Sequence, residues 1–151
     1  HLCEHALDAA LAVMNTYPRN NHTWGLIHAD LRPSNIIRAD NGDLTVIDFD
    51  DAGYSWYLYD YASSLSFVEH KPYAPQLAKA WLDGYVSVAG PMSSEELHVM
   101  SALSMIRRLQ MLGWTTNHRE DALPEGLAAE QAAGTVQCAR NYLADAQWLL
   151  R

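Results

Sequence analysis

Positive charge is scarce in this sequence. Ten lysines and arginines stand against eighteen aspartates and glutamates among 151 residues, which gives a formal net charge of −8. Only Lys71 and Lys79 are lysines. Because nucleic acids are bound largely through basic patches that neutralise phosphates, this balance argues against a nucleic-acid partner. It is compatible with a cationic small molecule, which an acidic surface attracts.

Cysteines and long apolar runs are also scarce. Cys3 and Cys138 lack the paired spacing of a zinc site or a redox motif, so we expect free, buried thiols in a reducing cytoplasm. No apolar run approaches the roughly eighteen residues of a membrane span, and no signal peptide opens the sequence. With 49% hydrophobic and 19% charged residues, residues 1–151 have the composition and length of a single globular domain.

Helical periodicity is abundant. Apolar residues recur at helical spacing from Leu2 to Tyr17, and Pro18 ends the pattern. An aromatic segment after Gly53 runs into a predicted helix that reaches Phe67. Further helices are expected at about 75–88, from a capping box at 93–96 to about 114, and from 124–126 to 150.

Between the first two helices the sequence predicts a small β element. Short apolar runs at 26–27, 36–37 and 44–47 are typical of strands. The turn signal Asp40-Asn41-Gly42-Asp43 separates the last two, because Asn-Gly tolerates the positive φ angles of a tight turn. The predicted fold class is therefore α+β and mainly helical, with a small β-hairpin that carries two polar loops.

These loops contain the residues best suited to catalysis. The first reads His28-Ala29-Asp30-Leu31-Arg32-Pro33-Ser34-Asn35, and the second reads Val46-Ile47-Asp48-Phe49-Asp50. Asp30 could orient a hydroxyl group and accept its proton. Asn35 and Asp48 offer the hard oxygen ligands that Mg²⁺ prefers, and Arg32 could neutralise a transferring phosphate. Phosphoryl transfer to a hydroxyl needs this set of groups.

Three further residues are candidates for supporting roles. His28 is expected to anchor the first loop, because Asp30 already fills the role of the base. Asp60 lies among aromatic residues, where an unpaired carboxylate is costly, so we expect it to accept hydrogen bonds from the loop backbone. Asp50 has two open interpretations, a contact to a second metal or a cationic substrate, or a solvated loop carboxylate. The aromatic residues at 54–61 are expected in the core, with a substrate-facing role for Tyr54 or Trp56 as the alternative.

The spacing of both loops resembles the catalytic and metal-binding loops of the aminoglycoside phosphotransferase and choline kinase family. Those enzymes are small-molecule kinases with a protein-kinase-like fold. The resemblance implies that Asp30 is the catalytic aspartate, that Asn35 and Asp48 bind Mg²⁺, and that ATP is the phosphate donor. Arg32 stands where protein kinases often place a lysine near the γ-phosphate. The implied acceptor is a hydroxyl group of a small, amine-bearing molecule such as an aminoglycoside, choline or homoserine.

The resemblance also implies that half of the enzyme lies outside this sequence. No Gly-x-Gly-x-x-Gly motif is present, and both lysines follow Asp30, whereas the nucleotide-binding lysine of a kinase precedes the catalytic loop. We therefore expect a C-terminal lobe that is inactive without an N-terminal nucleotide-binding lobe. Two alternatives stay open: a non-catalytic kinase-like module for binding or assembly, and a metal-dependent hydrolase that uses the same carboxylates.

Overall fold

Helices make up most of the computed structural model, which describes residues 1–118 and 124–150. The helices are α1 (Leu2–Thr16), α2 (Tyr59–Ser64), α3 (Ala74–Ala89), α4 (Ser94–Asn117) and α5 (Leu127–Ala144). The strands are β1 (Trp24–Ile27), β2 (Ile36–Arg38), β3 (Leu44–Val46) and β4 (Gly53–Trp56), and a 3₁₀ turn, η1, spans Pro33–Asn35. The mainly helical α+β prediction is confirmed.

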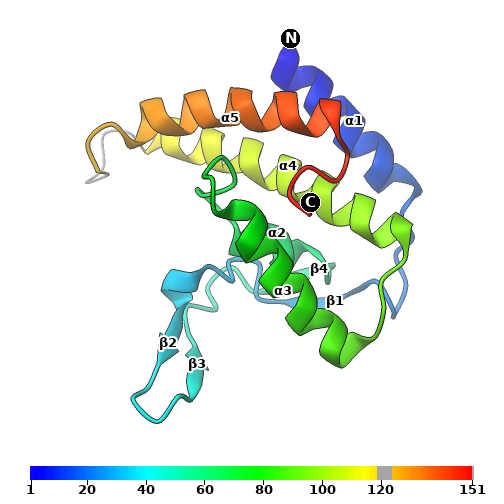
Figure 1. Ribbon diagram of the computed structural model, residues 1–151, viewed down its shortest axis with the longest axis vertical. Helices are drawn as coiled ribbons and strands as arrows, with labels where there is room; N and C mark the ends of the chain where they lie inside the picture. Colours follow the sequence, from blue (N-terminus) through cyan, green and yellow to red (C-terminus); the bar gives the residue numbers. More distant parts are fainter. Residues whose placement is uncertain (119–123, 151) are drawn as a thin grey trace.

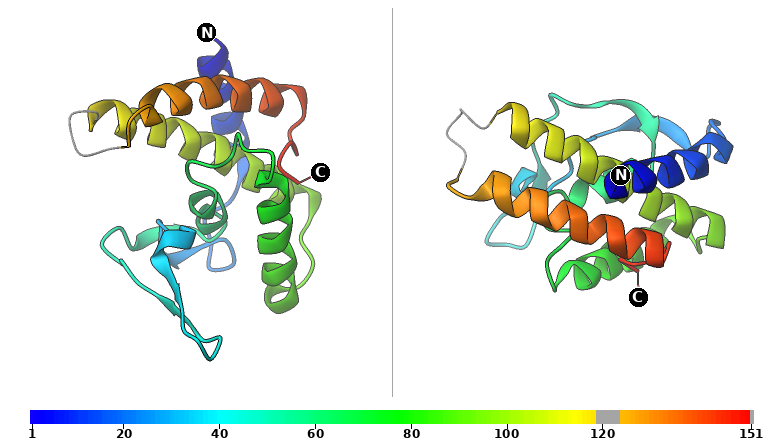
Figure 2. Two further views of the ribbon diagram at one scale, coloured as in Figure 1. Left: turned by 60° about the vertical axis from the view of Figure 1, so that its left-hand side comes forward. Right: turned by 90° about the horizontal axis from the view of Figure 1, so that it is seen from above.

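Helix α4 is the centre of the packing. It lies beside α5 and contacts α1 and α2 as well, so that these helices enclose one core (Figures 1 and 2). Its start is fixed by the predicted capping box, in which the Ser93 side chain accepts from the Glu96 N–H and the Glu96 carboxylate accepts from the Ser93 N–H. The side chains that α4 buries include Val99, Met100 and Leu103. A rigid central helix of this kind can position polar residues on its remaining faces.

The strands form two separate antiparallel ribbons rather than one small sheet. Strands β2 and β3 make the predicted hairpin, which projects away from the helices (Figure 1). Strand β1 pairs with β4, and the facing Trp24 and Trp56 rings pack edge to face at 4.8 Å. Strand β4 was not predicted, because its four residues lie inside an aromatic segment that reads equally well as the approach to a helix.

Two predicted helix ends are wrong. Helix α2 ends at Ser64 rather than near Phe67, whose φ of +73° is incompatible with a continuing helix. Helix α5 ends at Ala144, where Asp145 becomes extended, and the following segment turns back so that Leu149 enters the core from outside the helix. Leu149 thus reaches the core from a turn, although the apolar spacing had predicted a helix up to residue 150.

A buried ion pair ties three elements together at the far side of the core. Arg108 on α4 donates from Nη1 to Oε2 of Glu69 at 2.7 Å, and both side chains are almost fully buried. Its Nε donates to Thr135 and its Nη2 to the carbonyl of Gln131, both on α5. Gly134 leaves the space for this contact, since a Cβ there would lie 2.6 Å from Nη2 of Arg108. The pair therefore fixes α4 against α5 and the segment after α2.

The sequence led us to expect no membrane-spanning segment and two free, buried cysteines. None of the helices in the described part of the chain combines the length and the apolarity needed to cross a membrane. Both cysteines are free, but only Cys138 is buried, while Cys3 is half-buried. Burial raises the pKa of the Cys138 thiol to about 12.

Candidate active site

The loop that carries Asp30 is held by the start of helix α2. Oδ2 of Asp60 accepts the His28 backbone N–H at 3.0 Å, and Oδ1 accepts the Ala29 N–H at 2.8 Å. One turn later, Oγ of Ser63 accepts the Leu31 N–H at 3.0 Å. Ala29 adopts a positive φ of +66°, which a residue with a side chain rarely does. The hydrogen bonds expected of Asp60 are thus present, and they fix the loop in a conformation it would not adopt alone.

His28 joins the two loops. Its Nε2 lies 2.9 Å from the carbonyl of Ile47, which can only accept, while its Nδ1 accepts the backbone N–H of Asp30 at 3.2 Å. This pattern specifies the neutral tautomer with the proton on Nε2. The ring also packs against Phe49, at 4.7 Å between centroids. Both nitrogens are occupied by backbone groups, so His28 has the geometry of an anchor rather than of a proton carrier.

The Asp30 carboxylate is largely buried, with 11% of its side-chain surface exposed, and three side chains donate hydrogen bonds to it. Oδ2 accepts from Nε of Arg32 at 3.0 Å and from Nδ2 of Asn35 at 3.1 Å. Oδ1 accepts from Nη2 of Arg107 at 2.6 Å. The loop residues singled out in the sequence therefore do converge. Arg32, however, contacts Asp30 directly rather than standing free beside it.

Arg107 is a residue of this site that the sequence did not single out. It lies on α4, 77 positions after Asp30, and its guanidinium also donates to Oγ of Ser66 at 3.0 Å and to the Tyr59 hydroxyl at 3.3 Å. The Tyr59 hydroxyl in turn donates to Oε1 of Gln110 at 2.7 Å. No motif marks Arg107, because its relation to Asp30 exists only after α4 has packed beside the loop.

The expected metal ligands, Asn35 and Asp48, offer oxygen donors of the kind that Mg²⁺ prefers. Both Nδ2 hydrogens of Asn35 are used, for the Asp30 carbonyl at 2.9 Å and for its carboxylate, which assigns Oδ1 as the remaining acceptor. Asp48 is exposed, and its carboxylate makes no hydrogen bond or ion pair with the described residues. No cluster of three His, Cys, Asp or Glu side chains suited to a metal occurs in residues 1–118 and 124–150. An ion here would therefore depend on phosphate or water oxygens as well, as Mg²⁺ commonly does.

Asp30 opens into a cleft of about 650 Å³, here called the Asp30 cleft. The second loop lines this cleft with Asp48, Asp50 and Asp51. Phe67 and one face of α4 line it as well. The α4 face consists of Arg107, Gln110, Met111 and Trp114. The lining of the site is thus acidic where the second loop contributes, and Phe67 and Trp114 add aromatic rings to it.

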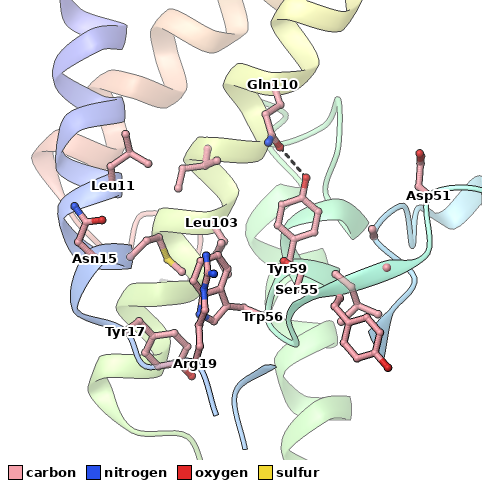
Figure 3. Close-up of a pocket in the computed structure, with 16 residues that line it drawn as sticks. Leu11, Asn15, Tyr17, Arg19, Asp51, Ser55, Trp56, Tyr59, Leu103 and Gln110 are labelled. Carbon is pink, nitrogen blue, oxygen red and sulfur yellow. Dashed lines mark hydrogen bonds between the residues drawn. The ribbon is translucent and has the colours of Figure 1, made fainter. Parts of the chain in front are cut away.

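A second, larger cleft of about 780 Å³ lies next to it, between α1, α4 and β4 (Figure 3). The two clefts share Ala29, Asp51, Tyr59 and Gln110 in their walls, so the Tyr59–Gln110 hydrogen bond lies at their boundary. Tyr54 and Trp56 both line this second cleft, and the core position expected of the aromatic residues at 54–61 is wrong for Tyr54, whose side chain is largely exposed. Outside the two clefts, His70 is largely buried, with 12% of its side chain exposed.

The solved structures similar to this chain include two kinases. The structure of a microcompartment-associated aminopropanol kinase matches 99% of this chain with a TM-score of 0.80 and 30% sequence identity. That of amicoumacin kinase hAmiN in complex with AMP-PNP, Ca²⁺ and Ami matches 92% of the chain with a TM-score of 0.67 at 18% identity, which supports the fold alone. This chain spans only 46% and 44% of those two chains.

Sequence comparison agrees. The amicoumacin kinase of Bacillus subtilis (strain 168) is 36% identical over 73 residues, which make up 48% of this chain and 21% of that kinase. Residues 2–96 match the phosphotransferase enzyme family, APH, and include both loops and the helix that holds the first of them. With more than half of its residues in that match, the chain belongs to the APH family of phosphotransferase enzymes.

Proposed function

We propose that this chain is the catalytic lobe of an ATP-dependent kinase that phosphorylates a hydroxyl group of a small, amine-bearing molecule. The observation that carries the proposal is the Asp30 carboxylate, which is fixed by charged and amide donors at the wall of a cleft. Family membership and the likeness to the aminopropanol kinase structure support the reaction class.

In this proposal Asp30 orients the acceptor hydroxyl and takes its proton as the phosphoryl group is transferred. A carboxylate already bound by Arg32, Arg107 and Asn35 reorganises little during the reaction, which is the condition for effective positioning. Arg32 contributes by holding Oδ2. Its side chain is one-third exposed, so it can also face a phosphate in the cleft.

Asn35 and Asp48 are the proposed ligands of a Mg²⁺ ion that accompanies ATP. The free Oδ1 of Asn35 and the unpaired Asp48 carboxylate fit a hard cation completed by phosphate oxygens. When bound, such an ion would neutralise charge on the nucleotide phosphates. Asp50 lines the same cleft and is proposed to contact either a second ion or the cationic part of the acceptor.

The walls of the Asp30 cleft favour an amine-bearing acceptor. Asp50 and Asp51 supply negative charge, and the Trp114 and Phe67 rings pack edge to face with centroids 6.2 Å apart. An ammonium group is attracted by carboxylates and by the faces of aromatic rings. The aminopropanol kinase that the chain resembles takes its name from an acceptor of this chemistry.

We also propose that a nucleotide-binding lobe covers the ribbons. Several apolar side chains there are exposed, among them Leu26, Ile37, Leu44 and Phe49, at 52% to 67%. Large exposed apolar side chains in such number are typical of a surface that contacts another domain. The chain also spans less than half of either kinase structure that it matches. His28 and Asp60 then keep their proposed roles as supports of the loop beneath that interface.

The test is an ATP-consumption screen of the full-length protein against small hydroxyl compounds, including amino alcohols, aminoglycosides, choline and homoserine. We expect one class to stimulate ADP formation and to appear as a phosphate ester. Asp30→Asn should lower kcat by about 10²–10⁴-fold, the usual contribution of general-base catalysis. The exposed Asp83, replaced by asparagine, is the matched control and should leave kcat unchanged.

Two other outcomes identify the competing functions. Phosphate release that requires the metal but no acceptor would identify a hydrolase. Nucleotide binding without consumption, whichever acceptor is supplied, would indicate a non-catalytic module. A phosphate ester formed at the normal rate by Asp30→Asn would show that Asp30 is not the base.

A further inference from the structure

The two oxygens of the Asp30 carboxylate have different hydrogen-bonding environments. Each carboxylate oxygen has about two acceptor sites. On Oδ2 both are taken, one by Nε of Arg32 and one by Nδ2 of Asn35. On Oδ1 a single donor is present within the described chain, Nη2 of Arg107. One acceptor site on Oδ1 is therefore left for a group that enters the Asp30 cleft.

We propose that Arg107 is a positioning residue, which holds Asp30 so that the acceptor hydroxyl binds to Oδ1. The inference rests on the proposed phosphotransferase function and adds to it the oxygen that takes the proton and the residue that orients this oxygen. The hydroxyl proton moves to Oδ1, the hydroxyl oxygen forms the bond to the γ-phosphorus, and the bond from that phosphorus to the β–γ bridging oxygen breaks to release ADP. Arg107 stays protonated throughout.

Arg107 is itself immobilised in a way that suits this role. Its Nε, Nη1 and Nη2 donate to three different acceptors, Oγ of Ser66, the Tyr59 hydroxyl and Oδ1 of Asp30, and only 12% of its side chain is exposed. A planar guanidinium held by two other bonds gives its bond to Oδ1 a fixed direction. Arg32 has one such bond and is more exposed, so it constrains Asp30 less.

The location of Arg107 adds a functional consequence. It belongs to the α4 face that forms one wall of the Asp30 cleft, together with Gln110, Met111 and Trp114. An acceptor that packs against this wall therefore meets an oxygen whose direction is set by the same helix. Alignment of the base with the acceptor does not depend on the loop alone.

The test uses the full-length protein with the acceptor found in the screen. Arg107→Met removes all three bonds at similar length, and Arg107→Lys keeps the charge but replaces the fork with a single point donor. We expect Arg107→Met to lower kcat by about 100-fold, the typical effect of misplacing a catalytic group by about 1 Å. The KM for ATP should not change, because Arg107 acts through Asp30. The kcat of Arg107→Lys should lie between those of the wild type and Arg107→Met. Added ethylguanidinium should restore part of the kcat of Arg107→Met.

Arg140 on α5 is exposed and makes no hydrogen bond or ion pair with the described residues, so Arg140→Met is the matched control and should keep full kcat. The inference is overturned if Arg107→Met keeps kcat, or if its defect is a raised KM for ATP with kcat unchanged. If Arg107→Met fails to fold, Arg107→Lys decides by the same two measurements. A wild-type protein that phosphorylates nothing refutes the proposed function instead, which is a different result.

Discussion

Replacing Asp60 with asparagine is expected to loosen the loop that carries Asp30. Both carboxylate oxygens of Asp60 accept a backbone N–H, from His28 at 3.0 Å and from Ala29 at 2.8 Å. Asparagine has one oxygen, and its NH₂ group can only donate. One of the two N–H groups would therefore face another donor. The substitution keeps the size of the side chain and removes one acceptor and the charge.

The structure sets the size of the effect. A hydrogen bond to a charged acceptor contributes about 1.5–3 kcal/mol, and a buried N–H without a partner costs a similar amount. We expect Asp60→Asn to lower the free energy of unfolding by about 2–3 kcal/mol. Asp83→Asn is the matched control, because Asp83 forms only an exposed pair with Lys79 one turn away on α3, worth about 0.3–0.5 kcal/mol.

Denaturant unfolding and phosphotransfer kinetics on the same preparations measure both consequences. A loop that is less well fixed should also lower kcat, since Asp30 is two residues from His28. Ala29→Gly in the Asp60→Asn background should recover about 1 kcal/mol, because glycine adopts the +66° φ without strain. If Asp60→Asn costs no more than Asp83→Asn in both assays, Asp60 does not brace the loop.

Two further predictions concern the buried cluster around Arg108. Gly134→Ala places a Cβ 2.6 Å from both Nη2 of Arg108 and Cγ of His70 and should cost about 1–3 kcal/mol of stability, whereas Gly113→Ala meets nothing within 4 Å and should gain about 0.5–1 kcal/mol in helix propensity. Thermal or denaturant unfolding checks both, and equal effects would contradict the packing described. Burial, and then the charge of Arg108, lowers the pKa of His70 from 6.5 in the folded chain. As the pH falls, the unfolded chain therefore binds a proton at His70 before the folded chain does. The free energy of unfolding should therefore fall as the pH decreases through 6.5, and the difference between wild type and His70→Gln should become independent of pH above that range.

Much of the site could be predicted from the sequence because its chemistry is local. Asp30 and Asn35 are five residues apart on one loop, and their contact through Nδ2 of Asn35 needs only the η1 turn between them. The hairpin was equally readable, since Asn41-Gly42 is a strong turn signal and the apolar runs on either side pair in antiparallel register. Spacing is informative when the turn between two residues also determines the distance between them.

Arg107 and β4 could not be predicted, because each depends on a contact between segments that lie far apart in the sequence. Arg107 reaches Asp30 only because α4 packs beside α2, so nothing in the residues around it distinguishes it from Arg108, which is buried in a structural ion pair. The two are neighbours on one helix and differ only in the face that each occupies. Strand β4 depends in the same way on β1, since four residues form a strand only when a partner strand is present.

The positive φ angles show how the fold, rather than the motif, fixes the site. Ala29, Asp48 and Phe67 are the non-glycine residues with positive φ in the described chain, and all three line the Asp30 cleft. Such a conformation costs on the order of 1 kcal/mol or more and persists only where surrounding contacts determine it.

For Ala29 the determining contact is Asp60, which lies 31 residues away. For Asp48 the backbone is fixed one residue earlier, where the Ile47 carbonyl accepts from His28 and the Ile47 N–H donates to the Asn35 carbonyl. Each loop thus holds the other in a conformation that neither would adopt alone. Because His28 and Asn35 take part in this exchange, their spacing from Asp30 sets the position of the second loop as well as that of the first. A one-residue insertion between Asp30 and Asn35 should therefore displace Asp48 together with Asn35, and so remove both proposed metal ligands at once.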